Sequence, residues 1–315
     1  MVNLRKVAII GCGFVGSSIA FSLMQKQLFS EMVLIDANTK KAEGEAMDLG
    51  HGLPYTSPMN IYAGTYDDIV DCAMIIITAG ANQKPDETRL DLIDKNVRIF
   101  KSIIPEISKK NCEGILLIVS NPVDVLTYVA YKLSGFPANR VIGSGTVLDT
   151  ARLKYLLGRH LSVDSRSVHA VIIGEHGDSE LVVWSGANIS GVPLNDFCEL
   201  RGHYQHEESM KRIYEDVRDS AYEIIEKKGA TYYGIAMAVS RIASSIIRNE
   251  HSIMPVSALL EGQYDGLEGL CLSVPSIVGK NGLEKVLDIQ LNANEHQALH
   301  DSAAQLKAVI DHIGL

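Results

Sequence analysis

The sequence predicts an α/β fold in which a doubly wound parallel sheet is followed by an α+β domain. In the first half of the 315 residues, short apolar runs alternate with stretches of helical spacing, which is typical of parallel strands joined by helices. A glycine-rich turn follows the first apolar run, where such folds pass from strand to helix. The second half lacks strict alternation. We therefore expect two domains, residues 1–145 and 146–315.

The elements of the first half follow from the spacing of apolar residues. Continuous apolar runs predict strands at residues 7–10, 32–35, 61–62, 74–78, 115–120 and 141–143. Apolar residues three or four positions apart predict helices at residues 16–27, 40–50 and 90–109.

The second half mixes longer helices with strands. The same patterns predict helices at residues 148–158, 207–228, 234–248 and 293–312. They predict strands at residues 168–174, 181–183, 253–260 and 270–278. No internal repeat or flexible linker interrupts either half.

Composition excludes several classes of protein. The net charge of −9 and the absence of a basic stripe argue against a nucleic-acid partner. The longest apolar runs, residues 74–77 and 115–119, are too short to cross a bilayer, so we expect no membrane partner. Five scattered cysteines form no CxxC pair, which favours reduced thiols, a cytoplasmic location and no bound metal.

The first segment with a chemical signature is Gly11-Cys-Gly-Phe-Val-Gly16, between the first predicted strand and helix. Gly11 allows the tight turn, Gly13 lets a pyrophosphate approach the backbone, and Gly16 allows close packing of helix on strand. Asp36 ends the next strand, twenty residues after Gly16, where its carboxylate would bind the ribose hydroxyls and repel a 2′-phosphate. The pattern predicts a Rossmann-type site for NAD; a glycine turn without a ligand is the alternative.

Two polar loops follow later strands of the same sheet, where the ligand crevice of this fold lies. The segment Asn82-Gln-Lys-Pro-Asp-Glu-Thr-Arg89 could form a lid that carries the guanidinium of Arg89 to a substrate, or a solvated surface loop. Asn121, in Ser120-Asn-Pro-Val-Asp124, could donate a hydrogen bond to a ligand, or mark an ordinary Asn-Pro turn.

A candidate acid–base group lies in the second half. His176 stands between glycines and acids in Ile-Ile-Gly-Glu-His-Gly-Asp-Ser, and an imidazole exchanges protons near neutral pH. Asp149 and Arg152 are three residues apart on one predicted helix face. They form a local ion pair, or each has its own partner: Asp149 would accept from His176, and Arg152 would bind a carboxylate.

Together these segments make the chain resemble the NAD-dependent lactate/malate dehydrogenase family, and within it the bacterial L-lactate dehydrogenases, over nearly its whole length. The matching stretches are AIIGCGFVG, VLID, AGANQKPDETR, VSNPVDVL, GSGTVLDTAR, IIGEHGDS and KGATYYGIA.

The resemblance implies a reversible hydride transfer between NADH and pyruvate that gives (S)-lactate. His176 would be the acid–base residue, Asp149 would orient it, Arg89 would stabilise charge on the substrate oxygen, and Arg152 would bind the carboxylate. Asn121 and Thr231 match substrate-contacting positions. The matching cofactor positions, besides the glycines and Asn121, are Val15, Asp36, Lys41, Tyr66, Gly80, Ala81 and Ser144.

Gln83 bears on the choice of substrate. The family's malate dehydrogenases carry arginine at this position, to pair with a second carboxylate, whereas a neutral glutamine suits the methyl group of pyruvate. A malate or branched-chain 2-hydroxy-acid dehydrogenase, and a non-catalytic NAD-binding relative, are the alternatives. The complete set of His176, Asp149, Arg89 and Arg152 argues against the last of these.

The chain departs from the family at residues that bear on lid motion and on regulation. Asp86 stands where the family commonly has glycine, which should slow the lid or weaken the capture of pyruvate. Many bacterial relatives bind fructose 1,6-bisphosphate with an arginine and a histidine; here Lys154 and His169 stand at those positions. Either the chain keeps a weakened activation, or His169 is an ordinary strand histidine and no effector binds. The resemblance also implies a homotetramer, for which the helices at residues 207–228 and 234–248 are candidate contact surfaces or simply cover their own sheet.

Overall fold

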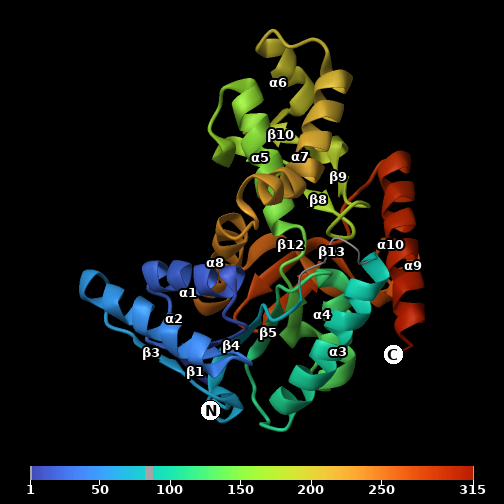
Figure 1. Ribbon diagram of the computed structural model, residues 1–315. Helices are drawn as coiled ribbons and strands as arrows, with labels where there is room; N and C mark the ends of the chain where they lie inside the picture. The colour runs from blue at the N-terminus through green and yellow to red at the C-terminus, as the bar shows by residue number, and fades with distance from the viewer. Residues whose placement is uncertain (1, 82–87, 315) are drawn as a thin grey trace.

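A nine-stranded sheet forms the centre of the computed structural model, which describes residues 2–81 and 88–314 (Figure 1). Six of its strands are parallel, in the order β3-β2-β1-β4-β5-β6, which is the order of doubly wound dinucleotide-binding sheets. They are β1 (Asn3–Ile10), β2 (Glu31–Ile35), β3 (Asn60–Ala63), β4 (Cys72–Ile77), β5 (Ile115–Ile118) and β6 (Val141–Gly143). The predicted parallel sheet is confirmed, and the strand order reverses between β1 and β4.

Three antiparallel strands extend this sheet beyond β6. They are β12 (Ser252–Glu261), β13 (Glu268–Gly279) and β14 (Gly282–Val286), and β12 pairs with β6 through Ser257 and Gly143. We expected the strands at 253–260 and 270–278 within a separate α+β region, and β14 was not predicted. No local pattern signals that a strand of the second half will pair with β6, more than a hundred residues earlier.

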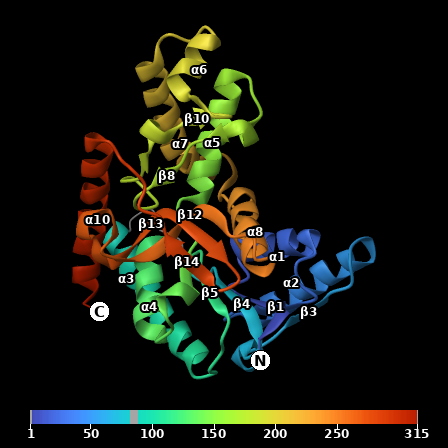
Figure 2. The ribbon, with the colours of Figure 1, turned by 180° about the vertical axis from the view of Figure 1, so that it is seen from behind.

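Helices cover both faces of the sheet (Figures 1 and 2). On one face lie α1 (Phe14–Lys26), α2 (Thr39–Gly52) and α8 (Tyr233–Ile247). On the other lie α3 (Arg89–Ser108), α4 (Val123–Ser134) and α10 (Ala293–Ile313). The helix α4 was not predicted: nine of its twelve residues are buried, and a short apolar segment can be either a buried strand or a buried helix.

A smaller lobe rises above the sheet and has its own core (Figure 1). Its helices are α5 (Val147–Leu161), α6 (Leu194–Leu200), which was not predicted, and α7 (His206–Lys228). The strand expected at residues 168–174 is broken into β7 (Val168–His169) and β8 (Ile172–Ile173), which belong to different small sheets. β7 pairs with β10 (Asn188–Ile189), which in turn pairs with β11 (Val192–Pro193), and β8 pairs with β9 (Leu181–Val182).

The remaining elements are short. A four-residue helix, α9 (Gln263–Gly266), contains three residues with positive φ. The 3₁₀ turns are η1 (Leu53–Tyr55), η2 (Tyr66–Ile69), η3 (Ala138–Arg140), η4 (Ser165–Ser167) and η5 (Trp184–Gly186). In the described part of the chain, no helix combines the length and the apolar character that a membrane span requires. The five cysteines are unpaired and buried.

Two long-range links bring the upper lobe to the edge of the sheet. Gly174, just after β8, exchanges backbone hydrogen bonds with Ser273 of β13. The hydroxyl of Thr146, which precedes α5, donates to the carbonyl of Ile172 in β8 at 2.6 Å. The loop after β8 and the first turn of α5 are therefore held side by side, next to the carboxyl end of β6.

Candidate active site

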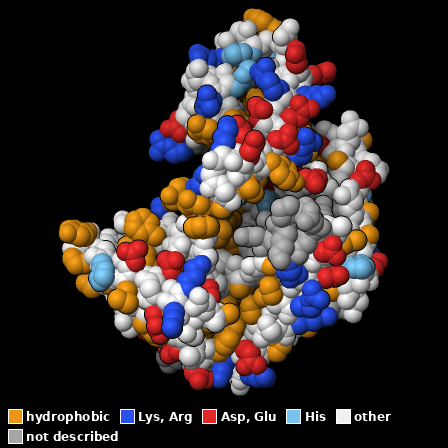
Figure 3. All heavy atoms as spheres, in the orientation of Figure 1, with side chains coloured by type: hydrophobic (Ala, Val, Ile, Leu, Met, Phe, Trp, Pro, Cys, Tyr) orange, Lys and Arg blue, Asp and Glu red, His pale blue; other side chains and the backbone are white. Residues whose placement is uncertain are grey.

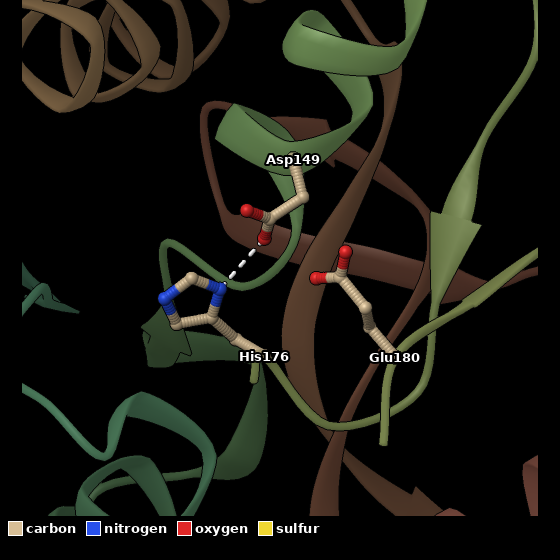
Figure 4. A group of neighbouring side chains, drawn as sticks. All are labelled: Asp149, His176 and Glu180. Carbon is tan, nitrogen blue, oxygen red and sulfur yellow. Dashed lines mark hydrogen bonds and ion pairs between the residues drawn. The ribbon is translucent and has the colours of Figure 1, made fainter. Parts of the chain in front are cut away.

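His176 and Asp149 meet where the loop after β8 passes the first turn of α5 (Figure 4). Nδ1 of His176 lies 2.6 Å from Oδ2 of Asp149. Asp149 is buried, whereas about a quarter of the His176 side chain (24%) is exposed. The carboxylate therefore fixes one ring nitrogen from inside the protein, and Nε2 points away from it (Figure 4).

Arg152 completes this cluster on the next turn of α5. Its Nη1 donates to Oδ1 of Asp149 at 2.8 Å, so the two oxygens of Asp149 have two different partners. The sequence left open whether Asp149 pairs with Arg152 or with His176, and the structure contains both interactions. Only one nitrogen of the guanidinium is used in this pair, which leaves N–H groups for a second anion.

The electrostatics of the cluster favour a charged imidazole. Burial disfavours protonation of His176, but the charge of Asp149 and its hydrogen bond outweigh burial and raise the pKa of the imidazole to about 9. Burial likewise opposes ionisation of Asp149, yet His176 and Arg152 together lower its pKa. At neutral pH, His176 is therefore an imidazolium that can donate a proton.

Asp124 holds the backbone of the same loop and was not singled out from the sequence. This buried residue lies in the first turn of α4. Its Oδ2 accepts a hydrogen bond from the backbone N–H of His176 at 2.8 Å, and its Oδ1 accepts one from the hydroxyl of Ser273 at 2.9 Å. Burial raises the pKa of Asp124 to about 6, partly offset by these hydrogen bonds. The only sequence signal was its place next to Asn121.

The loops after β4 and β5 carry Gly80, Ala81 and Asn121, and a second residue missed from the sequence joins them. Asn96 of α3 is 1% exposed; its Oδ1 accepts from the backbone N–H of Ala81 at 2.8 Å and its Nδ2 donates to the carbonyl of Asn121 at 2.8 Å. The Asn121 side chain is exposed at the carboxyl end of the sheet. One buried amide thus fixes the spacing of two loops on either side of the crevice.

Steric limits explain the glycines between β1 and α1. A Cβ on Gly16 would lie 1.9 Å from the carbonyl oxygen of Gly11, and Gly11 itself has φ +102° with backbone atoms of Ala79 under 3 Å from its would-be Cβ. Gly13 differs, since a Cβ there would meet no atom within 4 Å. Gly11 and Gly16 are required by packing, whereas Gly13 leaves space open at the start of α1.

The same region fits the phosphates and ribose of a dinucleotide. No side chain caps α1, so the N–H groups of its first turn are available to an anion. Asp36, at the end of β2, accepts from the backbone N–H of Cys12 at 2.7 Å and from that of Asn38 at 2.8 Å. Its carboxylate is thus held beside the glycine turn, where it can accept further hydrogen bonds from hydroxyl groups.

The other predicted cofactor residues lie around this end of the sheet. Val15 is partly buried in the first turn of α1, and Lys41 is exposed in the first turn of α2. Ser144 is buried directly after β6, and its N–H donates to the carbonyl of Ile118. Tyr66 differs from the rest: it packs partly buried against the core on the α3 side, and burial raises the pKa of its phenol.

Of the remaining predicted residues of the substrate region and the lid, the structure describes Thr231 in full. Thr231 is half-buried just before α8, and the start of α8 packs on α5, since a Cβ on Gly234 would lie 2.8 Å from Leu148. Gln83 and Asp86 lie outside the described residues, as does the side chain of Arg89, the first residue of α3. The undescribed segment is drawn in grey in Figure 3.

The two predicted effector residues lie in the upper lobe. His169 is exposed in β7, and Lys154 is half-buried on α5, where burial lowers the pKa of its ammonium group. Neither residue belongs to the His176–Asp149 cluster.

In the described part of the chain, one group of three side chains is close enough to hold a metal ion: Asp149, His176 and Glu180. Both oxygens of Asp149 already have partners, and one partner is a guanidinium at 2.8 Å. A further cation beside Arg152 would be repelled, so we interpret the group as a site for protons. Glu180 is the third member of the site that the sequence did not reveal.

Comparison with known proteins agrees with this geometry. Residues 5–143 match the model of the lactate/malate dehydrogenase NAD-binding domain, and residues 146–314 match that of the family's alpha/beta C-terminal domain. An L-lactate dehydrogenase of Acetivibrio thermocellus is 57% identical over 98% of this chain and 96% of its own length. L-lactate dehydrogenase 1 of Clostridium acetobutylicum is 54% identical over 99% of this chain and all of its own.

Solved structures give the same result. A lactate dehydrogenase from a Medee basin deep-sea metagenome library superimposes with a TM-score of 0.96, at 46% identity and over the full length of both chains. The minor L-lactate dehydrogenase of Enterococcus mundtii in its ligands-bound form gives a TM-score of 0.95, at 44% identity over 99% of each chain. This chain belongs to the lactate/malate dehydrogenase family.

Proposed function

We propose that this chain is an NAD-dependent L-lactate dehydrogenase that interconverts pyruvate and (S)-lactate, the last step of homolactic fermentation. The observation that carries the proposal is the 2.6 Å contact between buried Asp149 and partly exposed His176 at the carboxyl edge of a dinucleotide-binding sheet. The relatives described above are lactate dehydrogenases over the full length of the chain. NADH, when bound, supplies the hydride.

His176 carries the proton in this mechanism. With its pKa raised to about 9, the imidazolium donates from Nε2 to the carbonyl oxygen of pyruvate, and the neutral ring takes the hydroxyl proton from lactate in the reverse direction. Asp149 stabilises the charged ring and fixes its orientation. Without that carboxylate, burial would favour the neutral ring and deprive pyruvate of its proton donor.

The arginines bind and polarise the substrate. Arg152 uses one N–H on Asp149, and its remaining N–H groups would hold the carboxylate of pyruvate beside His176. Arg89 would stabilise the charge that develops on the carbonyl oxygen, and Asn121 and Thr231 would contact the substrate from the neighbouring loops. Residues 1–145 would then hold the cofactor, and residues 146–315 would supply most of the substrate site.

The glycine turn and Asp36 would hold NAD rather than NADP. The open space at Gly13 and the uncapped start of α1 suit the pyrophosphate. Two ribose hydroxyls would donate to Asp36, while a 2′-phosphate would meet its negative charge. Val15, Lys41, Tyr66, Gly80, Ala81, Asn121 and Ser144 complete the proposed cofactor contacts.

Gln83 would select pyruvate over oxaloacetate, because a neutral amide cannot pair with a second carboxylate. Initial rates on pyruvate, oxaloacetate and 2-oxoisocaproate should rank pyruvate first by a wide margin. The variant Gln83→Arg should move the preference toward oxaloacetate. No NADH oxidation with any of the three acids would overturn the assignment as a dehydrogenase, and an unchanged preference in Gln83→Arg would remove Gln83 from substrate selection.

Fructose 1,6-bisphosphate would activate the enzyme only weakly. Lysine lacks the two-pronged geometry with which arginine binds phosphate, and burial already disfavours the charged form of Lys154. Titration of activity with the sugar bisphosphate at sub-saturating pyruvate should show weak activation in the parent and stronger activation in Lys154→Arg. Equal responses of the two proteins would exclude Lys154 from an effector site.

A homotetramer in the cytoplasm is the assembly we propose. Support comes from large hydrophobic side chains that are more than half exposed on the adjoining helices α1 and α8: Phe14, Phe21, Tyr233 and Met237. The helix α7 is the second candidate surface. Sedimentation of the purified chain gives its subunit number directly.

A further inference from the structure

A third ionisable side chain, Glu180, lies beside the His176–Asp149 pair (Figure 4). It comes immediately before β9 and is 4% exposed. One carboxyl oxygen of Glu180, one of Asp149 and one ring nitrogen of His176 lie within 4.8 Å of one another. Two buried carboxyl groups therefore flank a single imidazole.

The side chain of Glu180 is not held as a structural carboxylate usually is. Its Oε1 is buried and has no hydrogen-bond partner within the described residues. The neighbouring phenol of Tyr214 donates to the backbone carbonyl of Glu180, at 2.6 Å, and not to its carboxyl group. Burying a carboxyl group without a partner is costly, and an apolar side chain would pack there at lower cost. The reason for an acid at this position must lie in its charge.

We propose that Glu180 is a positioning residue: a second buried carboxyl group that keeps the imidazole of His176 protonated as the pH rises, and so favours pyruvate reduction over lactate oxidation. The inference rests on the proposed function of His176 as the proton donor. It adds a residue that acts on the reaction through His176 and does not touch the substrate.

The charges around Glu180 set the order in which protons leave. Burial and the charge of Asp149 raise the pKa of Glu180 to about 8, although His176, Arg152 and Arg218 oppose this. The pKa of His176 is about 9. As the pH rises, Glu180 therefore ionises first, and its new negative charge retains the proton on the imidazole.

Several elements packed around the site contribute further ionisable groups. Besides Asp149 and Arg152 on α5, these groups are Asp124 on α4, Asp178 in the loop after β8, Tyr214 and Arg218 on α7, and Glu295 and Asp301 on α10. Of the acids among them, Asp149 is the one whose charge most strongly opposes ionisation of Glu180.

A cavity gives Glu180 its own route for protons. It has a volume of about 420 Å³, and its lining includes Glu180, Trp184, Tyr214 and Ser302, but neither His176 nor Asp149. Glu180 can therefore exchange a proton through the space between α7 and α10 while a ligand covers the other side of the imidazole. The carboxyl group responds to pH without opening the substrate site.

The first test is the pH dependence of kcat/KM for pyruvate, in the full-length enzyme and in Glu180→Gln. The alkaline midpoint should fall by about one pH unit in the variant, because an anion within 5 Å of the imidazole is lost. Lactate oxidation near pH 8.5, where Glu180 is ionised in the parent, should rise about threefold, as a shift of one pH unit in that midpoint implies. Asp301→Asn, which removes a charge from the same cavity farther from the imidazole, should leave the midpoint in place, and Glu180→Met should move it as Glu180→Gln does.

A second measurement needs no turnover. Histidines labelled with ¹³C at Cε1 can be titrated by NMR without substrate, and the His176 signal can be assigned by its loss in His176→Asn. Its midpoint should be lower in Glu180→Gln than in the parent. Equal midpoints in both experiments, with only a lower melting temperature, would reduce Glu180 to a packing role. A parent enzyme that does not reduce pyruvate would instead contradict the proposed function, and the NMR result would still decide the role of Glu180.

Discussion

The crevice has a nucleotide end, formed by the turn from Gly11 to Gly16 and by Asp36, and a chemical end, formed by His176, Asp149 and Arg152. The two ends are built in opposite ways. Between β1 and α1, the backbone determines the site: Gly11 and Gly16 are required because a Cβ would clash with the turn itself or with Thr78 and Ala79 after β4. Around His176, side chains determine the site, and its partners come from α4, α5 and the loop after β8. A short motif is enough to recognise the first region, whereas the second is recognised only once the chain is folded.

This difference has energetic consequences. At the nucleotide end a wrong side chain is a steric clash, which destabilises the fold itself. At the chemical end a wrong side chain changes charge and proton affinity while the backbone stays in place. We therefore expect substitutions at the two ends to separate into effects on stability and effects on rate.

The strongest test of this separation is His176→Asn. Loss of the proton donor should lower kcat for pyruvate by about 10³-fold, within the range for general acid–base residues. The dissociation constant of NADH, measured by fluorescence, and the melting temperature should change little, because the ring is partly exposed. A large loss of stability would show that the chemical end also supports the fold.

The pH profile should reveal the charge relation between His176 and Asp149. Because Asp149 raises the pKa of the imidazole to about 9, the protonated form dominates below that value. Pyruvate kcat/KM should be flat at neutral pH and fall about tenfold per unit above the midpoint, while lactate oxidation rises over the same range.

In Asp149→Asn the midpoint of that profile should move down by about two units, because the stabilising anion is gone. A midpoint that stays near 9 in this variant would mean that another group sets the protonation of His176.

Two glycine substitutions test the nucleotide end. Gly16→Ala places a Cβ 1.9 Å from a carbonyl oxygen and should lower the free energy of unfolding by about 2–4 kcal/mol. Gly13→Ala meets no atom, so it should cost less than about 1 kcal/mol in stability and yet weaken NADH binding, because the methyl group occupies the space left for the pyrophosphate. Equal stability of the two variants would contradict the steric argument.

The smallest expected effect concerns the link between the two ends. Asn96→Ala removes the amide that joins the loops of Ala81 and Asn121, and should raise the KM values for NADH and pyruvate by up to about tenfold, as expected for a lost buried hydrogen bond. A change in only one KM would show that the loops are positioned independently. Asn96→Asp, which keeps the acceptor and loses the donor, separates the two bonds.

The features predicted best from the sequence are those that a local pattern of residues determines. The strands β1, β2, β4 and β5 are short continuous apolar runs, and the glycine turn and Asp36 have fixed spacing, so both were accessible without a structure. The helix α4 was missed because most of it is buried, and a short apolar segment does not show whether it forms a buried strand or a buried helix. The break between β7 and β8 follows from pairing with two different sheets, which no residue in the segment announces.

The main residues of the chemical end were predicted from the sequence, but the contacts among them were not. His176, Asp149 and Arg152 stand in recognisable segments, but the double use of the Asp149 carboxylate depends on geometry. Asp124 and Asn96 act through contacts with residues 15 to 149 positions away, and Glu180 lies beside Asp149, 31 positions away. An isolated acid or amide in the sequence carries no sign of such a contact. The periodicity of apolar residues does not show which residues far apart in the chain will be in contact.

Because β6 pairs with β12, the two halves of the chain share one sheet, and neither half should fold without the other. A fragment that stopped at residue 145 would leave β6 as a bare edge with unsatisfied N–H and C=O groups, open to aggregation. A fragment that began at residue 146 would lose the strand against which β12 is aligned, and with it the support for the Gly174–Ser273 bridge. Although the family is described by two domain models that meet near this point, neither fragment should fold on its own. A split enzyme should regain activity only when both fragments refold together.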